Sequence, residues 1–214
     1  TVDLVLSLSA DGSGVIRWWV DASYGVHMDM KSHTGAMMSL GKGAAYSMSG
    51  GQKIVGCSST EAELIGVHDV MPQVIWTRNF LMAQGYDVKD NILYQDNMST
   101  MLLAKNGRAS VGKRSRHINI RYFFVKDRIA NKELRIEHCP TEDMWADFFT
   151  KPLQGQLFYR LRDQIMNIDS TSQHHSSHRS VLKVSDPALN KSEPGLTSGQ
   201  GAESRTYKSA LMNQ

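Results

Sequence analysis

Carboxylates stand at the ends of several predicted structural elements. Asp21 closes one strand-like run and Asp96 closes another, while Asp147 lies in a short apolar segment and Glu61 and Glu63 open a long helical pattern. Each alone is typical of caps, turns or ion pairs. A sheet that pairs the strands of Asp21 and Asp96 would bury like charges together, which requires a compensating cation. Such hard oxygen ligands favour Mg²⁺ or Mn²⁺.

The helix start that carries the two glutamates is the most informative local pattern. Ser59 or Thr60 can cap the helix, and both glutamates suit the positive end of its dipole. On a helical wheel, Glu61 and Glu63 flank opposite sides of the apolar stripe that begins at Leu64. At most one of them faces a site on a given side, and the wheel does not decide which. Taken alone, both glutamates are more simply interpreted as solvated charges in the first turn of the helix.

The remaining chain alternates strand and helix signals. Strand formers separated by glycine turns predict an antiparallel meander before the helix, and an apolar run that ends in a carboxylate predicts a parallel strand after it. We expect strands at 15–22, 35–40, 44–49, 53–58, 92–96 and 134–138, and helices at 59–84, 97–104, 117–131, 144–149 and 153–168.

Composition favours one globular domain with appendages. The chain has 214 residues, of which 41% are hydrophobic and 21% charged, and a net charge of +3. The segment 105–128 holds eight basic residues against one aspartate, a balance of +7 that leaves −4 for the rest. This asymmetry suits a surface that binds a polyanion, and equally a solvated helix face.

The predicted organisation is a connecting segment at 1–14, a domain at 15–168 and a disordered tail at 169–214. The chain opens at Thr1 without an initiator methionine or a leader, so we expect a piece of a longer protein. The tail is rich in Ser, His, Lys, Gly and Pro. Its histidines at 174, 175 and 178 lack a second ligand group at plausible spacing for a metal.

Two further absences limit the classes of protein. Cys57 and Cys139 are too few for a disulfide framework, so we expect reduced structural thiols in an intracellular protein. No run of about 18 apolar residues exists, so we expect no membrane span.

Six motifs in order resemble the ribonuclease H domain of copia-type retrotransposon Pol polyproteins, over Arg17 to about Gln156. The resemblance implies an α/β ribonuclease H-like fold, with a five-stranded mixed sheet of an antiparallel meander plus parallel strands, flanked by helices. The motifs are WVDAS (19–23), SHTG (32–35), SSTEAEL (58–64), YQDN (94–97), RHINIRY (116–122) and ADFFTKPL (146–153).

The resemblance also implies a four-carboxylate catalytic and metal site at Asp21, Glu63, Asp96 and Asp147. It selects Glu63 because the family's catalytic glutamate precedes an apolar pair, here Leu64 and Ile65. Two Mg²⁺ or Mn²⁺ ions in such a site activate a water and stabilise the leaving 3′ oxygen. The reaction it implies is hydrolysis of the RNA strand of an RNA–DNA hybrid during reverse transcription.

Nucleic-acid contacts are expected in two places. By family position, Ser59, Thr60 and Asn97 would contact 2′-hydroxyl groups. The basic segment would contact the phosphate backbone through Lys113, Arg114 and Arg116. His138 falls nine residues before Asp147, where some relatives place a mobile histidine, but its alternating surroundings predict an ordinary strand residue.

Two departures from the family pattern leave the carboxylates intact. Gly50 to Lys53 replaces a more polar turn, and Trp145 replaces a smaller apolar residue. A catalytically decayed nucleic-acid-binding module is one alternative function. An integrase-type transposase, which uses three acidic residues, is another, although the motifs at 60–64 and 146–153 favour the nuclease. We expect an upstream reverse transcriptase as partner, and location in a cytoplasmic virus-like particle or the nucleus.

Overall fold

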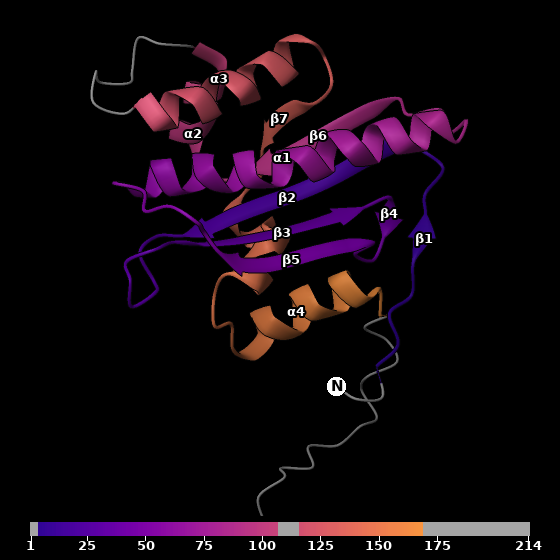
Figure 1. Ribbon diagram of the computed structural model, residues 1–214. Coiled ribbons are helices and arrows are strands. Elements are labelled where there is room, and N and C mark those ends of the chain that lie inside the picture. Colours follow the sequence, from indigo (N-terminus) through magenta and orange to yellow (C-terminus); the bar gives the residue numbers. More distant parts are fainter. Residues whose placement is uncertain (1–3, 107–115, 169–214) are drawn as a thin grey trace, which may run out of the picture. The chain divides into compact units, whose positions relative to one another are not determined.

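The computed structural model describes residues 4–106 and 116–168, shown in colour in Figure 1. Within its helices, the side chains of residues 103–106 and 116–119 lie outside the description. The expected tail, including its histidine cluster, and both Lys113 and Arg114 therefore lie outside the described residues. Arg116 is described only as the first residue of a helix.

The central sheet has the predicted five mixed strands in the order β5-β3-β2-β6-β7. Strand β3 is antiparallel to both β2 and β5, whereas β6 runs parallel to β2, and β7 runs parallel to β6. This arrangement is the meander plus parallel strands of the ribonuclease H-like fold. The strands are β2 (Val15–Ser23), β3 (His33–Ser39), β5 (Tyr46–Gly51), β6 (Asp90–Gln95) and β7 (Arg135–His138).

Helices cover both faces of this sheet (Figure 1). The long α1 lies along β2 and β3 on one face, and α3 packs against α1. On the other face, α4 packs against the 3₁₀ helix η3, which contacts β2 and β3. The helices are α1 (Ser59–Ala83), α2 (Met98–Asn106), α3 (Arg116–Ala130), η2 (Thr141–Asp143), η3 (Trp145–Phe149) and α4 (Gly155–Met166).

Strand β2 divides its side chains between two cores, because successive side chains of a strand point to opposite faces. Trp18 and Val20 are fully buried in the core that faces α1, together with Val70 and Val74 of that helix. Trp19 lies in the second core, with residues of η3 and α4. Both faces of β2 are therefore buried, and the strand end is fixed from both sides.

Two local predictions were wrong. Residues 53–58 form no strand: the neighbouring Gln52 is buried and donates instead to Thr34 Oγ1 and to the Ala62 carbonyl, which directs the chain into α1. The helix cap is Ser58, whose Oγ accepts from Glu61 N at 3.1 Å, rather than Ser59 or Thr60.

The segment at 1–14, which we predicted as a connecting segment, contains a short strand. Its β1 (Ser9–Ala10) pairs antiparallel with β4 (Gly41–Lys42) in a second, two-stranded sheet. The meander also contains β2, β3 and β5 rather than the predicted run at 53–58. Among the described helices, none is long and apolar enough to cross a membrane.

Candidate active site

Three carboxylates converge at one edge of the sheet. Asp21 lies near the end of β2, Asp96 directly follows β6, and Glu63 lies in the first turns of α1. One oxygen of each lies within 4.8 Å of the others. The carboxyl ends of parallel β2 and β6 meet at the same edge, which brings Asp21 and Asp96 together as predicted. Asp21 and Glu63 are buried, and Asp96 is half-buried.

Glu63, rather than Glu61, faces this cluster. Its Oε2 accepts a hydrogen bond of 2.8 Å from Nε2 of Gln95, a fully buried residue at the end of β6. Burial, reinforced by the charge of Asp21, raises the pKa of Glu63 to about 8. The carboxylate of Glu61 instead accepts from the backbone N–H of Cys57 at 2.7 Å. The partner described for Glu63 is thus a neutral amide.

Asp147 joins the site through a lysine. Lys151 Nζ lies 2.7 Å from Asp147 Oδ1 and 3.8 Å from Asp21 Oδ1. Burial raises the pKa of Asp147 to about 6, although the hydrogen bond from Lys151 opposes this shift. Burial lowers the pKa of Lys151, but its hydrogen bond to Asp147 and the charges of Asp21 and Asp147 outweigh that effect and raise it. The fourth predicted carboxylate, Asp147, is therefore already paired with the ammonium of Lys151.

The turn after η3 is tied to the end of β2. Thr150 Oγ1 donates to Asp21 Oδ2, and Ser23 Oγ donates to the Thr150 carbonyl at 2.9 Å. Burial raises the pKa of Asp21, and the Thr150 hydrogen bond opposes the rise. Gly35, which pairs with Asp21 in the sheet, permits this approach, because a Cβ there would lie 2.6 Å from the Thr150 methyl. The absence of a side chain at Gly35 thus lets the turn reach the site.

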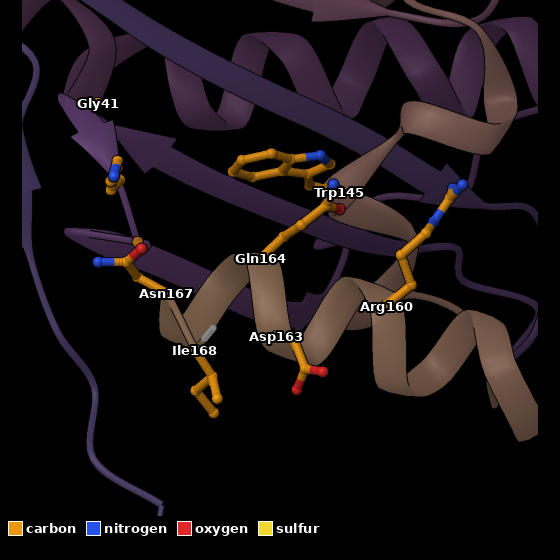
Figure 2. A pocket seen from close by; sticks show the side chains of 9 residues that line it. Gly41, Trp145, Arg160, Asp163, Gln164, Asn167 and Ile168 are labelled. Atoms are coloured by element: carbon orange, nitrogen blue, oxygen red, sulfur yellow. The ribbon is translucent and has the colours of Figure 1, made fainter. Parts of the chain in front are cut away.

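The unusual Trp145 has a clear structural role. Its ring stacks on Trp19 with centroids 4.5 Å apart and planes 3° apart. Trp19 lies two residues before Asp21, and Trp145 lies two residues before Asp147. The stack therefore holds the two segments that carry these carboxylates. Figure 2 shows Trp145 beside Gln164 of α4, in a cavity of about 320 Å³ that none of the four carboxylates lines.

The residues expected to contact 2′-hydroxyl groups lie at two adjacent helix starts. Ser59 and Thr60 begin α1. Asn97 caps α2, because its Oδ1 accepts from Thr100 N at 3.1 Å, and Thr100 Oγ1 donates to the Thr60 carbonyl at 3.4 Å. Asn97 adjoins Asp96 in sequence, so these helix starts border the carboxylate cluster.

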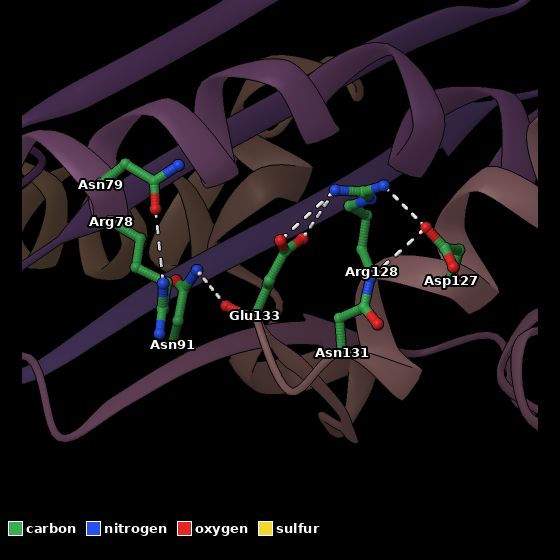
Figure 3. Close-up of polar contacts among 7 residues, drawn as sticks. All are labelled: Arg78, Asn79, Asn91, Asp127, Arg128, Asn131 and Glu133. Carbon is green, nitrogen blue, oxygen red and sulfur yellow. Dashed lines mark hydrogen bonds and ion pairs between the residues drawn. The ribbon is translucent and has the colours of Figure 1, made fainter.

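One member of the basic segment is committed to internal ion pairs. Arg128 contacts Glu133 at 3.1 Å and Asp127 at 2.6 Å, and Asn131 also reaches Asp127 (Figure 3). Arg128 also lies over the ring of Phe124. Its charge is therefore balanced within the domain. His138 ends β7 as an exposed strand residue, as its sequence pattern predicts.

Sequence reasoning missed three polar residues of the site: Gln95, Thr150 and Lys151. Lys151 had a local signal, because it follows Asp147 by four residues, the spacing of a helical ion pair. Gln95 also had one, since it is a polar residue directly after the run Ile-Leu-Tyr at 92–94 of the same strand. The bond of Thr150 to Asp21 spans 129 positions and has no local signal.

The donor chemistry fits hard divalent cations. The cluster offers carboxylate oxygens alone, from three residues within 4.8 Å, and burial holds two of them in an environment that disfavours uncompensated charge. Such oxygen-only donor sets select Mg²⁺, Mn²⁺ or Ca²⁺ over softer metals. Asp21, Glu63 and Asp96 would hold one ion, whereas Asp147 lies outside this group of three and is linked to Asp21 through Lys151.

Comparison with known proteins adds the context of the chain. No protein-family model matches it. It is 30% identical over 145 residues to the retrovirus-related Pol polyprotein from transposon TNT 1-94 of Nicotiana tabacum, covering 67% of this chain and 11% of that protein. It is 31% identical over 138 residues to the corresponding polyprotein from transposon RE1 of Arabidopsis thaliana, covering 64% and 9%. The chain is a homologue of retrovirus-related Pol polyproteins of plant transposons.

This Pol homologue spans only about a tenth of the length of those relatives. Among solved structures, LC11-RNase H1, isolated from compost, aligns with 63% of this chain and 91% of its own, at 11% identity and a TM-score of 0.46. The strand order and directions given above define the fold of the Pol homologue independently of that alignment.

Proposed function

We propose that this Pol homologue is a metal-dependent ribonuclease H that hydrolyses the RNA strand of RNA–DNA hybrids during retrotransposon reverse transcription. The observation that carries the proposal is the convergence of Asp21, Glu63 and Asp96 at the edge where β2 and β6 end, with Asp147 beside Asp21. The homology to Pol polyproteins supports the same activity.

The residues of the chain would prepare a site for two Mg²⁺ or Mn²⁺ ions, held by Asp21, Glu63, Asp96 and Asp147. When bound, such ions activate a water and stabilise the leaving oxygen of a phosphodiester. Glu63 must first lose its proton, because its pKa of about 8 keeps it largely neutral at pH 7. Gln95 would orient the Glu63 carboxylate through its 2.8 Å hydrogen bond.

Substrate recognition would use the surface around the carboxylates. Ser59, Thr60 and Asn97 border the cluster at the starts of α1 and α2, where 2′-hydroxyl contacts would distinguish RNA from DNA. The basic segment would add phosphate contacts through Lys113, Arg114 and Arg116. An upstream reverse transcriptase in the same polyprotein would supply the hybrid.

The decisive experiment compares Asp96→Asn with Glu61→Gln in cleavage of a labelled RNA–DNA hybrid. Losing a metal ligand should cost more than the roughly 10- to 100-fold that loss of an outer partner costs. Glu61→Gln removes a charge near Glu63 in the first turns of α1, but Glu61 lies outside the cluster. This variant should keep near wild-type rates of cleavage. Ca²⁺ should bind without supporting turnover, because its coordination is looser.

The outcomes separate the candidate functions. Cleavage that persists in folded Asp96→Asn would reject the proposed site. Hybrid binding without Mg²⁺- or Mn²⁺-dependent cleavage by the wild-type chain would instead support a decayed nucleic-acid-binding module.

A further inference from the structure

The two halves of the carboxylate site differ in what neutralises them. Asp21, Glu63 and Asp96 share one cluster of oxygens, whereas Asp147 is linked to Asp21 by the ammonium of Lys151. The Lys151 nitrogen contacts one oxygen of each aspartate, at 2.7 and 3.8 Å. A cation thus already lies between these two carboxylates.

The backbone fixes where this lysine begins. Lys151 N donates to the Asp147 carbonyl at 2.9 Å, and Thr150 N donates to the same carbonyl at 3.2 Å, which closes a turn over Asp147. Leu153 N donates to the Lys151 carbonyl at 2.9 Å on the far side of Pro152. The lysine side chain is nevertheless 37% exposed, so its ammonium has a path to solvent. The backbone of Lys151 is therefore fixed, whereas its partly exposed side chain can move away from the two aspartates into solvent.

We propose that Lys151 is a positioning residue that holds the place of a divalent cation between Asp21 and Asp147, and that a second metal ion binds only by displacing its ammonium. This inference rests on the proposed function. The site would then fill in two steps: a first ion at the cluster of Asp21, Glu63 and Asp96, and a weaker second ion that competes with Lys151.

The competition has a defined direction. Displacing the lysine breaks a charge-assisted hydrogen bond, a cost that partial exposure to solvent reduces. Removing the ammonium should therefore tighten the second binding event on the order of tenfold. The first event should change less, because among its three carboxylates only Asp21 lies within 4 Å of the Lys151 ammonium, whereas Asp96 acts on it as a more distant charge. If Lys151 were purely structural, its removal would lower the stability of the fold without changing the affinity of the second binding event relative to the first.

The test is to measure Mn²⁺ binding to the whole chain by calorimetry and by electron paramagnetic resonance. The second method detects spin coupling between two neighbouring ions. The variants are Lys151→Met and Lys151→Gln, which remove the charge, and Lys151→Arg, which keeps it. Lys89→Met removes an equal charge just before the start of β6, at the opposite end of that strand from Asp96. Two charge-removing variants guard against one that fails to fold.

We expect two Mn²⁺ events in the wild-type chain, a second event about tenfold tighter in both charge-removing variants, and wild-type-like values for Lys151→Arg and Lys89→Met. A second affinity that is unchanged or weaker without Lys151 would overturn the inference while leaving the metal site and the proposed function in place. Failure of every variant to bind Mn²⁺ would overturn both.

Discussion

Glu63 and Asp147 are both buried acids of one site, yet they are stabilised differently. Glu63 has the amide of Gln95 as its described partner, and its pKa rises to about 8. Asp147 has the ammonium of Lys151, and its pKa rises only to about 6. Burial dominates both shifts, so the smaller rise at Asp147 is consistent with an internal cation.

The difference predicts what a metal ion must displace in each half of the site, the half that contains Glu63 and the half that contains Asp147. A buried carboxylate without a cationic partner favours its neutral form, and an arriving divalent ion must displace its proton. A carboxylate paired with a lysine is already charged, and an arriving ion must displace the lysine instead. Metal binding at the Glu63 half should therefore depend on pH near neutrality, whereas at the Asp147 half it should depend on Lys151.

The largest expected effect is on the stability of the metal-free protein. The raised pKa of Glu63 means that the folded state binds more protons than the unfolded state between pH 4.5 and about 8, so stability falls across that window. Glu63→Gln removes this loss, which is worth about 1.4 kcal/mol for each unit of pKa shift. Its advantage over wild type should grow from pH 5 to pH 8.

Asp147→Asn is the matched variant for that measurement. The window of Asp147 lies lower, from 3.8 to about 6, and losing the partner of Lys151 offsets part of the gain. Its difference from wild type should be smaller and should level off above about pH 6. Urea unfolding of both variants with a chelator present measures this. If the difference in unfolding free energy between Glu63→Gln and wild type stayed constant from pH 6 to pH 8, the contrast between Glu63 and Asp147 would be contradicted.

A smaller effect is expected from the neutral partner of Glu63. Gln95→Leu removes the 2.8 Å hydrogen bond that orients the carboxylate, and should weaken Mn²⁺ binding roughly 10- to 100-fold. Thr141→Val is the control, because its hydroxyl contacts Asp96 only at 3.4 Å and in an exposed position. Calorimetric titration should show little change for the control. Equal losses in both variants would mean that the Gln95 bond has no special role.

The smallest effect concerns the support of the Asp147 half. Trp145→Leu removes the stack on Trp19 and should cost about 1–3 kcal/mol of unfolding free energy, from lost stacking and lost buried area. Trp76→Leu is the control, since Trp76 also stacks, on Phe80, but is 56% exposed. It should cost less. A larger loss at Trp76 would show that the Trp19 stack does not support this half.

Sequence patterns alone predict the positions at which strands end in carboxylates. Alternating and apolar runs placed Asp21 and Asp96 at strand ends, and the same signals located β2, β6 and the start of α1 within a few residues. These patterns succeed because side-chain periodicity follows directly from backbone geometry. The choice of Glu63 over Glu61 required the family motif, since the helical wheel left both open.

The partners that neutralise the carboxylates, in contrast, depend on tertiary contacts. Residues 53–58 have strand-forming composition, yet they follow an edge strand and turn at once into α1, where the buried Gln52 bonds Thr34 and Ala62 instead of a ladder. Likewise, the bonds from Gln95 to Glu63 and from Thr150 to Asp21 join residues 32 and 129 positions apart. Local periodicity says nothing about such contacts, because they arise only once α1, β2, β6 and η3 are packed together.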